Sequence, residues 1–368
     1  RFELREGGIL TFIDPGVPVL MGAGDDTVVV RSSAWTASGM PWFNGGDDTD
    51  TIEFSTAAPV TFENGNFTNV YFTNFEKLIK SGDGELTLKS DAGGDGFDSI
   101  TAAGGTLALV GTWGITVNSV DATEVIGDGV TPTFVTAAGA TGINPGGLLK
   151  VAGNAAYFAL GQTDIDGGTL TIETGGQYHG FPGITGAANG DTINIHGLLN
   201  GSTVNLGGGE DAITLSGALI ASGVVTLGDG DDSFTFESDG SLLLPIVSGG
   251  IQGGDGGETN GDDLIFAGTV DYDVAMDALP VSGFENLVKA GSNIWTLTAA
   301  GAGTSFQSIT VDGGTLVLIG AWTVTGNTTT VNSGDTLTIG DGGIDSSLHE
   351  MGDLDVSGTF NVVNMGTV

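Results

Sequence analysis

Acidic, glycine-rich turns are the residues of this sequence that could do chemistry. Five nine-residue segments combine Gly and Asp in nearly the same order, with an apolar residue at the eighth position: Met21–Val29, Gly45–Glu53, Gly93–Thr101, Leu206–Thr214 and Leu227–Thr235. Glycine turns expose backbone carbonyl oxygens, and aspartates add carboxylate oxygens. Hard oxygen ligands at this density suit Ca²⁺ rather than Zn²⁺, so the pattern predicts calcium sites at one or more turns.

The candidate calcium ligands are aspartates of these turns: Asp25, Asp26, Asp47, Asp48, Asp95, Asp98, Asp211, Asp229, Asp231 and Asp232. Stacked coils would place Asp211 and Asp232 roughly 4.8 Å apart, which is the spacing of adjacent strands. Carboxylates this close repel each other, and a cation would relieve the repulsion. The alternative is a tight, solvated turn in which each Asp hydrogen-bonds to its own backbone.

The elements that must position these turns are short strands repeating at a fixed period. The segment Val204–Leu215 returns as Val225–Phe236 after 21 residues, and Asp191 precedes Asp211 by 20. A period of this length is typical of repeating coils, and it puts Asp191, Asp211 and Asp232 in equivalent places. We therefore expect one continuous β-solenoid over residues 1–368, with 20–21 residues per coil and about 17 coils.

A larger repeat divides the chain into two related arms. Residues 74–118 align without a gap on 283–327, an offset of 209 residues, and twelve of the twenty positions in 99–118 are identical to their equivalents. The arms cover about 20–145 and 226–368, and residues 146–225 join them. A solenoid tolerates such a duplication because each coil contacts its neighbours alone.

Composition supports strands and turns and argues against several partners. Gly accounts for 67 of 368 residues, and apolar residues make up 39%, which is too much for a disordered chain. Eight Lys and Arg face 45 Asp and Glu, a net charge of −37, which argues against nucleic acids and anionic lipids as partners. There is no Cys and no apolar run of 18 residues, so neither a disulfide nor membrane insertion by a helix is expected.

Two sets of motifs resemble known families. The motif Phe-Glu-Asn-Leu-x-Lys-x-Gly at 284–291, followed by Gly-Gly-Thr-Leu at 313–316, resembles the passenger region of autotransporter proteins. That resemblance implies a right-handed parallel β-helix secreted by Gram-negative bacteria. The segment Gly93–Thr101 resembles the calcium nonapeptide of RTX proteins, and the other four turns depart from it at one position. RTX nonapeptides run in tandem, whereas here they are isolated.

Signals for an enzyme are weak. His179, His196 and His349 have neither metal-site nor triad spacing, and no phosphate loop or Gly-x-Ser-x-Gly motif is present. A carbohydrate-active β-helix remains an alternative, because hydrolysis of a glycoside needs two carboxylates at a set separation. Its candidate carboxylates are Asp47, Asp48 and Asp50, and the best-placed basic residues are Lys80 and Lys289.

Aromatic residues give a further set of candidate contacts. Trp113 and Trp322 are equivalent by the 209-residue offset, which indicates packing rather than sugar binding. Trp35 and Trp42 flank a loop-like stretch and are candidates for exposed contacts. The aromatic segment 176–183, which contains Tyr178, His179 and Phe181, is another.

The expected function is that of an extracellular structural or adhesive rod on a bacterial surface, without catalysis. It would present loops and associate with itself end to end or laterally, with surface glycans as a further class of partner. The open strand edges of a parallel solenoid favour such association. The alternatives are a self-assembling surface-layer, sheath or filament subunit and the carbohydrate-active enzyme.

Overall fold

The computed structural model describes residues 2–4, 19–31, 43–62, 72–90, 95–240, 242–254, 256–279, 281–299, 304–326, 328–342, 346–350 and 352–363. Over these residues the chain is a parallel β-solenoid of about 14 turns, which confirms the predicted fold class. The helical element described is the short 3-10 helix η2 (Met276–Ala278). None of the described helical structure is long and apolar enough to cross a membrane.

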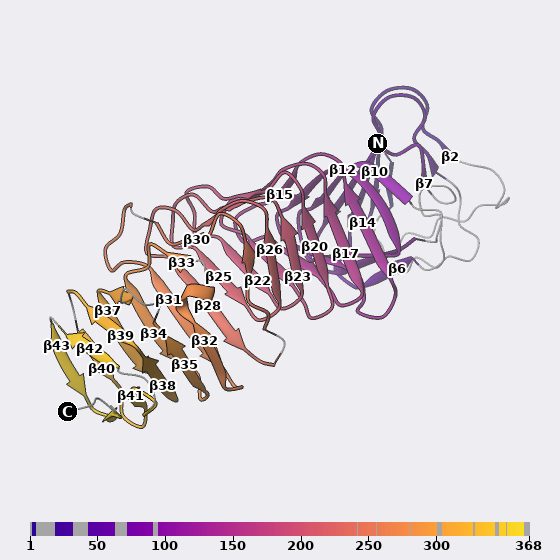
Figure 1. The fold of residues 1–368 in the computed structure, drawn as a ribbon. Helices are drawn as coiled ribbons and strands as arrows, with labels where there is room; N and C mark the ends of the chain where they lie inside the picture. Colours follow the sequence, from indigo (N-terminus) through magenta and orange to yellow (C-terminus); the bar gives the residue numbers. More distant parts are fainter. Residues whose placement is uncertain are drawn as a thin grey trace. The chain divides into compact units, whose positions relative to one another are not determined.

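The described residues fall into two compact units, whose boundary lies within the predicted joining segment 146–225. Unit 1 comprises Arg1–Gly186 and Gly197–Gly201, and unit 2 comprises Ala187–His196 and Ser202–Val368. Each unit is a stack of parallel strands. Figure 1 shows this for β14 (Thr133–Ala137), β17 (Ala155–Ala159) and β20 (Gln177–Gly180) in unit 1 and for β31 (Asp263–Gly268), β34 (Asn286–Ala290) and β37 (Ser308–Asp312) in unit 2.

Unit 1 has one regular face and one in which strands are split by turns. The regular face consists of β6 (Val60–Phe62), β9 (Glu85–Lys89), β11 (Thr106–Val110), β13 (Thr123–Ile126), β16 (Leu148–Val151) and β19 (Thr169–Ile172). The other strands are β1 (Phe2–Leu4), β2 (Val19–Leu20), β3 (Thr27–Val30), β4 (Phe43–Asn44), β5 (Thr51–Ser55), β7 (Phe72–Thr73), β8 (Lys77–Ser81), β10 (Asp95–Ala102), β12 (Thr112–Val120), β14 (Thr133–Ala137), β15 (Thr141–Ile143), β17 (Ala155–Ala159), β18 (Thr163–Ile165), β20 (Gln177–Gly180), β21 (Ile184–Thr185) and β23 (Leu198–Gly201).

Unit 2 is built in the same way. Its regular face consists of β22 (Thr192–Ile195), β25 (Ala212–Leu215), β28 (Ser233–Ser238), β31 (Asp263–Gly268), β34 (Asn286–Ala290), β37 (Ser308–Asp312), β40 (Thr328–Val331) and β43 (Asp353–Val356). The remaining strands are β24 (Val204–Asn205), β26 (Ala218–Ala221), β27 (Val225–Thr226), β29 (Ile246–Val247), β30 (Ile251–Gln252), β32 (Tyr272–Ala275), β33 (Val281–Ser282), β35 (Ile294–Thr298), β36 (Thr304–Phe306), β38 (Thr315–Ile319), β39 (Ala321–Val324), β41 (Thr336–Ile339), β42 (Ser347–Glu350) and β44 (Thr359–Val362).

The core of each unit is made of columns of side chains in register along the stack. Because alternate residues of a strand point inward, a Thr-Leu-Thr-Ile strand places Leu and Ile in two neighbouring columns. One column of unit 1 contains Val60, Leu86, Leu107, Glu124, Leu149 and Leu170. Its apolar members are at most 4% exposed, and burying one leucine contributes about 1.5–3 kcal/mol. Glu124 is the exception in this column, because it is a buried acidic residue between leucines.

Coil length varies more than the sequence period indicates. The step along the stack is 20 residues from Asp191 to Asp211 and 21 to Asp232, as predicted, but 30 to Asp262. In unit 1 the steps are 24 residues from Asp26 to Asp50 and 26 to Glu76. These longer coils explain why the chain makes about 14 turns instead of about 17.

Glycine is required where successive turns touch. Gly46 has φ 116° and Gly228 has φ 119°, a region that other residues rarely adopt. A Cβ on Gly46 would lie 1.7 Å from the carbonyl oxygen of Gly22, and one on Gly228 would lie 2.1 Å from that of Gly207. The acidic turns can therefore stack backbone on backbone because they carry glycine at these positions.

Candidate functional site

In three of the five acidic turns the sixth residue lies in the interior of the solenoid, whereas Asp26 is half-buried and Asp98 is exposed. Asp50, Asp211 and Asp232 are at most 2% exposed, and Asp191 and Asp262 occupy the same place in their coils and are also buried. Each directly precedes a strand whose second residue is an inward-pointing apolar side chain. The acidic turn and the strand that follows it therefore fix this Asp at the inner corner of the coil.

These aspartates form a ladder of hydrogen bonds along the stack of unit 2, which we call the acid ladder. The backbone N–H of Asp191 donates to Oδ1 of Asp211 (2.6 Å), that of Asp211 to Oδ1 of Asp232 (2.8 Å), and that of Asp232 to Oδ1 of Asp262 (2.9 Å). Each carboxylate thus accepts a bond from the backbone of the preceding coil. The expected repulsion between Asp211 and Asp232 is offset in part by this bond, because a donor faces one oxygen of each.

A glutamate ends the ladder in each unit. The N–H of Asp262 donates to Oε2 of Glu285 (3.0 Å). In unit 1 the N–H of Asp26 donates to Oδ1 of Asp50 (2.7 Å), and that of Asp50 to Oε2 of Glu76 (2.7 Å). Glu76 and Glu285 are related by the 209-residue offset, so the two arms repeat the end of the ladder as well as its strands.

The second oxygen of the buried aspartates lacks a partner. Oδ2 of Asp50, Asp211, Asp232 and Asp262 is buried without a hydrogen bond. Burial raises the pKa of Asp211 and of Asp262 to about 7; the bond from the preceding amide lowers it, and neighbouring carboxylates raise it further. Burial also raises the pKa of Asp50 and Asp232. Oxygens of this kind either hold a proton or face a cation.

The outer aspartates of the turns bind backbone amides of the neighbouring turn. Oδ1 of Asp25 accepts from the N–H of Thr49 (3.1 Å), and Oδ2 of Asp48 accepts from the N–H of Gly24 (3.0 Å). In unit 2 Oδ1 of Asp231 accepts from the amides of residues 259–261 at 2.7–3.2 Å. These bonds resemble the predicted solvated-turn alternative, except that the amide belongs to the next coil.

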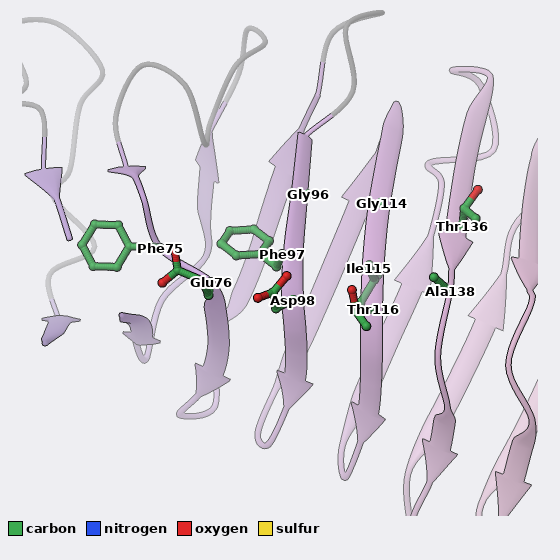
Figure 2. Close-up of a pocket in the computed structure, with 10 residues that line it drawn as sticks. All are labelled: Phe75, Glu76, Gly96, Phe97, Asp98, Gly114, Ile115, Thr116, Thr136 and Ala138. Atoms are coloured by element: carbon green, nitrogen blue, oxygen red, sulfur yellow. The ribbon is translucent and has the colours of Figure 1, made fainter. Parts of the chain in front are cut away.

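The structure brings together some predicted calcium ligands and separates others. In unit 1 Asp25 and Asp48 each accept an amide of the other's turn, Ala23 pairs with Asp47, and Asp26 lies next to Asp50. In unit 2 Asp211, Asp229, Asp231 and Asp232 lie on stacked turns. Residues 91–94 lie outside the described part of the chain, and Asp95 and Asp98 lie in strand β10. Figure 2 shows Asp98 beside Glu76 on adjacent strands, at a shallow depression that Phe75 and Phe97 also line.

The basic residues considered for an enzyme are structural anchors. Lys80 Nζ donates to the carbonyl oxygens of Ser81 (3.0 Å), Gly82 (2.8 Å) and Gly104 (3.0 Å). Lys289 Nζ donates to the equivalent carbonyls of Ala290, Gly291 and Gly313, and also to Oδ1 of Asn293. Both side chains are fully buried, and burial lowers the pKa of Lys289 to about 8. With three carbonyl oxygens around each ammonium group, these lysines tie two successive coils together.

Two histidines and two of the tryptophans singled out in the sequence have identifiable contacts within the fold. His179 stacks on Phe158 at 4.8 Å, His196 Nδ1 bonds Ser216, and His349 is exposed in β42. Trp113 and Trp322 are 1% exposed, as predicted for packing residues, and each Nε1 donates to the carbonyl three residues earlier. Trp35 and Trp42 lie outside the described residues.

The sequence did not point to Asp262, Glu285 or Glu76 as members of the ladder. Asp262 lies 30 residues after Asp232, beyond the 21-residue period, so its equivalence was hidden. The Phe-Glu motifs at 75 and 284 are visible in the sequence as a repeat. The same Glu at both positions, 209 residues apart, was the signal that could have identified these two ladder members. The unpartnered buried oxygens of Asp211, Asp232 and Asp262 offer proton-holding and cation-binding chemistry.

Comparison with protein-family models, curated proteins and solved structures finds no match to this chain.

Proposed function

We propose that this chain is an extracellular structural and adhesive solenoid of a bacterial surface, which presents its outer faces and associates with copies of itself. The autotransporter-like motifs, the absence of Cys and the net charge of −37 support this setting. Calcium bound at the outer acidic turns is part of the proposal, since Asp47 and Asp229 are exposed there.

One observation carries the adhesive role, namely an apolar stripe on the outer surface of unit 1. The stripe consists of Phe134, Phe158, Leu160, His179 and Phe181, which lie on outward positions of β14, β17 and β20 or directly after them. Phe134, Leu160 and Phe181 are 50%, 49% and 55% exposed. Large apolar side chains gathered on one face commonly mark a contact surface.

The arrangement of the rings favours a protein partner over a sugar. Phe158 and His179 stack with an interplanar angle of 6°, and His179 and Phe181 with an angle of 15°. Stacked rings cover each other's faces and leave their edges outward, whereas a sugar-binding platform offers a free ring face. A ridge of ring edges suits packing against another copy of the solenoid.

The basic residues of the core favour the structural role over the enzyme. Lys80 and Lys289 bind backbone carbonyls in equivalent ways, so neither is poised in a groove as a base. A sheath or filament subunit, the alternative within the same class, would share the outer stripe and add contacts between the solenoid ends.

The test is the assembly state of the purified chain. We expect electron microscopy and sedimentation to show concentration-dependent association, and the double variant Leu160→Ser, Phe181→Ser to remove it. Each experiment is run with Ca²⁺ and with excess chelator, so that a contribution of the acidic turns appears as loss of assembly on chelation.

The matched control is Leu243→Ser, which removes an apolar side chain that is 61% exposed in unit 2. This variant should associate as the wild type does. Single chains at every concentration, or assembly of the stripe variant equal to that of the control, would refute the adhesive role of the stripe.

A further inference from the structure

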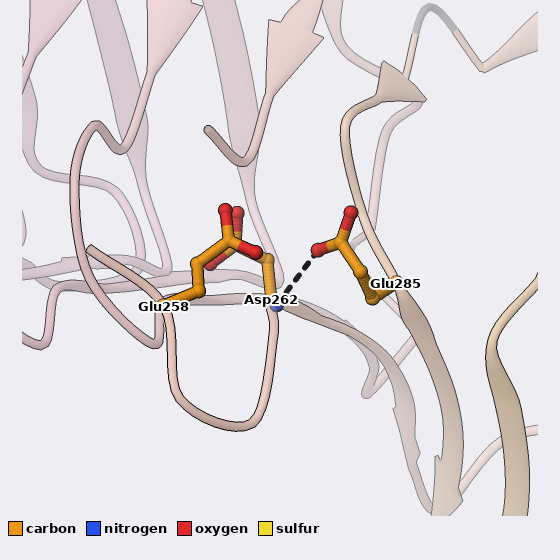
Figure 3. A group of neighbouring side chains, drawn as sticks. All are labelled: Glu258, Asp262 and Glu285. Atoms are coloured by element: carbon orange, nitrogen blue, oxygen red, sulfur yellow. Dashed lines mark hydrogen bonds between the residues drawn. The ribbon is translucent and has the colours of Figure 1, made fainter. Parts of the chain in front are cut away.

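Three carboxylates meet at the end of the acid ladder in unit 2. Glu258, Asp262 and Glu285 each offer one oxygen, and these oxygens lie within 4.8 Å of one another. Glu258 and Asp262 come from the loop before β31, and Glu285 directly precedes β34, as Figure 3 shows. No member of this group belongs to the turn aspartates that the sequence singled out.

Asp262 has one oxygen to spare. Its side chain is fully buried, and its Oδ1 accepts the N–H of Asp232. Its Oδ2 is buried and has no hydrogen-bond partner. The N–H of Asp262 is already bonded to Glu285, as the dashed line in Figure 3 marks. A buried carboxylate oxygen without a donor is costly, so the group calls for a positive ligand or a proton.

Hydrogen bonds to Asp231 of the preceding coil hold the loop that carries Glu258 in place. Asp231 accepts the amides of Thr259, Asn260 and Gly261, and its Oδ2 accepts from Nδ2 of Asn260 (2.9 Å). This anchoring fixes the residues between Glu258 and Asp262. The three carboxylates are therefore brought together by the fold before any ligand binds, which reduces the entropy that binding must overcome.

A backbone carbonyl adjoins the group. A Cβ on Gly253 would lie 2.3 Å from Oδ2 of Asp262 and 2.1 Å from the carbonyl oxygen of Gly283. Gly253 therefore packs closely against these two oxygens, and a larger residue at this position would fill the space beside them. The group thus consists of three carboxylates, and the carbonyl of Gly283 lies near the spare oxygen of Asp262.

We propose that Glu258, Asp262 and Glu285 bind one Ca²⁺ ion. Calcium takes six to eight oxygen ligands at about 2.3–2.6 Å, so two oxygens on one ion lie at most about 5 Å apart, as these do. Three carboxylates with variable denticity suit calcium better than Mg²⁺, which demands near-ideal octahedral geometry. Water would complete the shell. This proposal is independent of the proposed surface role, because it is tested by ion binding to a single chain and not by association between chains.

The test is calorimetric titration of the metal-stripped full chain with CaCl₂ at physiological ionic strength, where diffuse binding to the acidic surface is screened. We expect a saturable site that Glu258→Gln and Glu285→Gln each weaken by about tenfold or more, since each removes a charged ligand. MgCl₂ should bind more weakly at the same site.

The matched control is Glu76→Gln. Glu76 ends the ladder of unit 1 in the same way, yet among the described residues it has no counterpart of Glu258 to form a group of three. This variant should titrate as the wild type does. Glu258→Gln binding Ca²⁺ like the wild type, tighter binding of Mg²⁺, or no saturable binding would overturn the assignment, and circular dichroism confirms that each variant is folded.

Discussion

The acid ladder uses carboxylates where a sheet would use carbonyls. Oδ1 of Asp211 accepts the amide of the coil before it, while the Asp211 amide donates to the coil after it. A buried amide left without an acceptor costs about 1–3 kcal/mol, and each Asp avoids this cost for its neighbour. The opposing cost is the burial of Oδ2, which has no hydrogen-bond partner. Burying the carboxyl group costs less free energy when it is protonated and neutral.

This balance predicts different effects for two substitutions at one site. Asp211→Ala leaves the Asp191 amide without an acceptor, so the free energy of unfolding should fall by about 1–3 kcal/mol. Asp211→Asn keeps an Oδ1 acceptor without the charge, so it should be as stable as the wild type or more so. Urea unfolding in chelator at neutral pH measures both. Equal destabilisation by Asn and Ala would show that the negative charge itself is needed.

Glu124 is the buried acid most isolated from water. It is fully buried between Leu107 and Leu149, and both its oxygens lack a hydrogen-bond partner, as does Oδ1 of Asn118. The polar groups near it are Asn118 and Tyr157, which bond to each other at 3.1 Å. Burial raises the pKa of Glu124 to about 7, although the Asn118 amide lowers it in part.

The raised pKa sets the sign of a pH effect. Folded Glu124 binds a proton up to about pH 7, whereas the unfolded chain releases it near the ordinary value of 4.5. Its contribution to stability is therefore full below pH 4.5 and is lost as the pH rises through 7, up to about 3 kcal/mol. Glu124→Gln should remove this component from the pH profile of urea unfolding. The exposed Glu85→Gln should leave the profile unchanged, and identical profiles for both variants would contradict the argument.

At the scale of elements, the two buried lysines hold the turns that follow β8 and β34. Each ammonium group donates to three carbonyls from two successive coils. The same arrangement 209 residues apart means that both arms conserve this contact in structure as well as in sequence.

Lys80→Met tests this anchoring role. Methionine fills the aliphatic volume but removes the donor to three part-buried carbonyls, so the free energy of unfolding should fall by about 2–4 kcal/mol. Lys77→Met, on the exposed face of the same strand, should change it by less than about 0.5 kcal/mol. Denaturant unfolding gives both values. A similar loss in the two variants would show that charge, and not the carbonyl bonds, matters.

How far the sequence predicts these elements depends on how regular each coil is. The turns with Gly-Asp and the alternating strands after them were predictable, because positive φ and two-residue alternation leave clear marks at Gly228 and in β25. The 30-residue coil before Asp262 hid the continuation of the ladder. Glu124 was hidden for another reason: in Thr-Glu-Val-Ile either alternate pair can face inward, and stacking decides that Glu124 and Ile126 do.

At the scale of the molecule, the successive coils that begin at Asp191, Asp211 and Asp232 make the same ladder bond to the next coil. Removing residues 212–232 deletes one whole coil and leaves the Asp211 amide positioned to meet Asp262. We expect this 21-residue deletion to keep the strand content and cooperative unfolding, because nearest-neighbour contacts are restored.

Deleting 212–222 is the comparison. These eleven residues are an incomplete coil, and their loss shifts the strands out of register and turns core residues outward. This variant should aggregate or unfold. Circular dichroism and thermal melting distinguish the two outcomes, and equal loss of structure in both deletions would show that the coils are not interchangeable.

The buried acids also make folding an exchange of hydrogen ions with the solvent. Glu124 and Asp211 take up protons when the chain folds near neutral pH and release them when it unfolds. Thermal unfolding should therefore acidify a weakly buffered solution, and the measured enthalpy should include the heat with which the buffer accepts these ions. The interior of this strongly acidic chain thus stores protons in the folded state and releases them to the solvent when the coils separate.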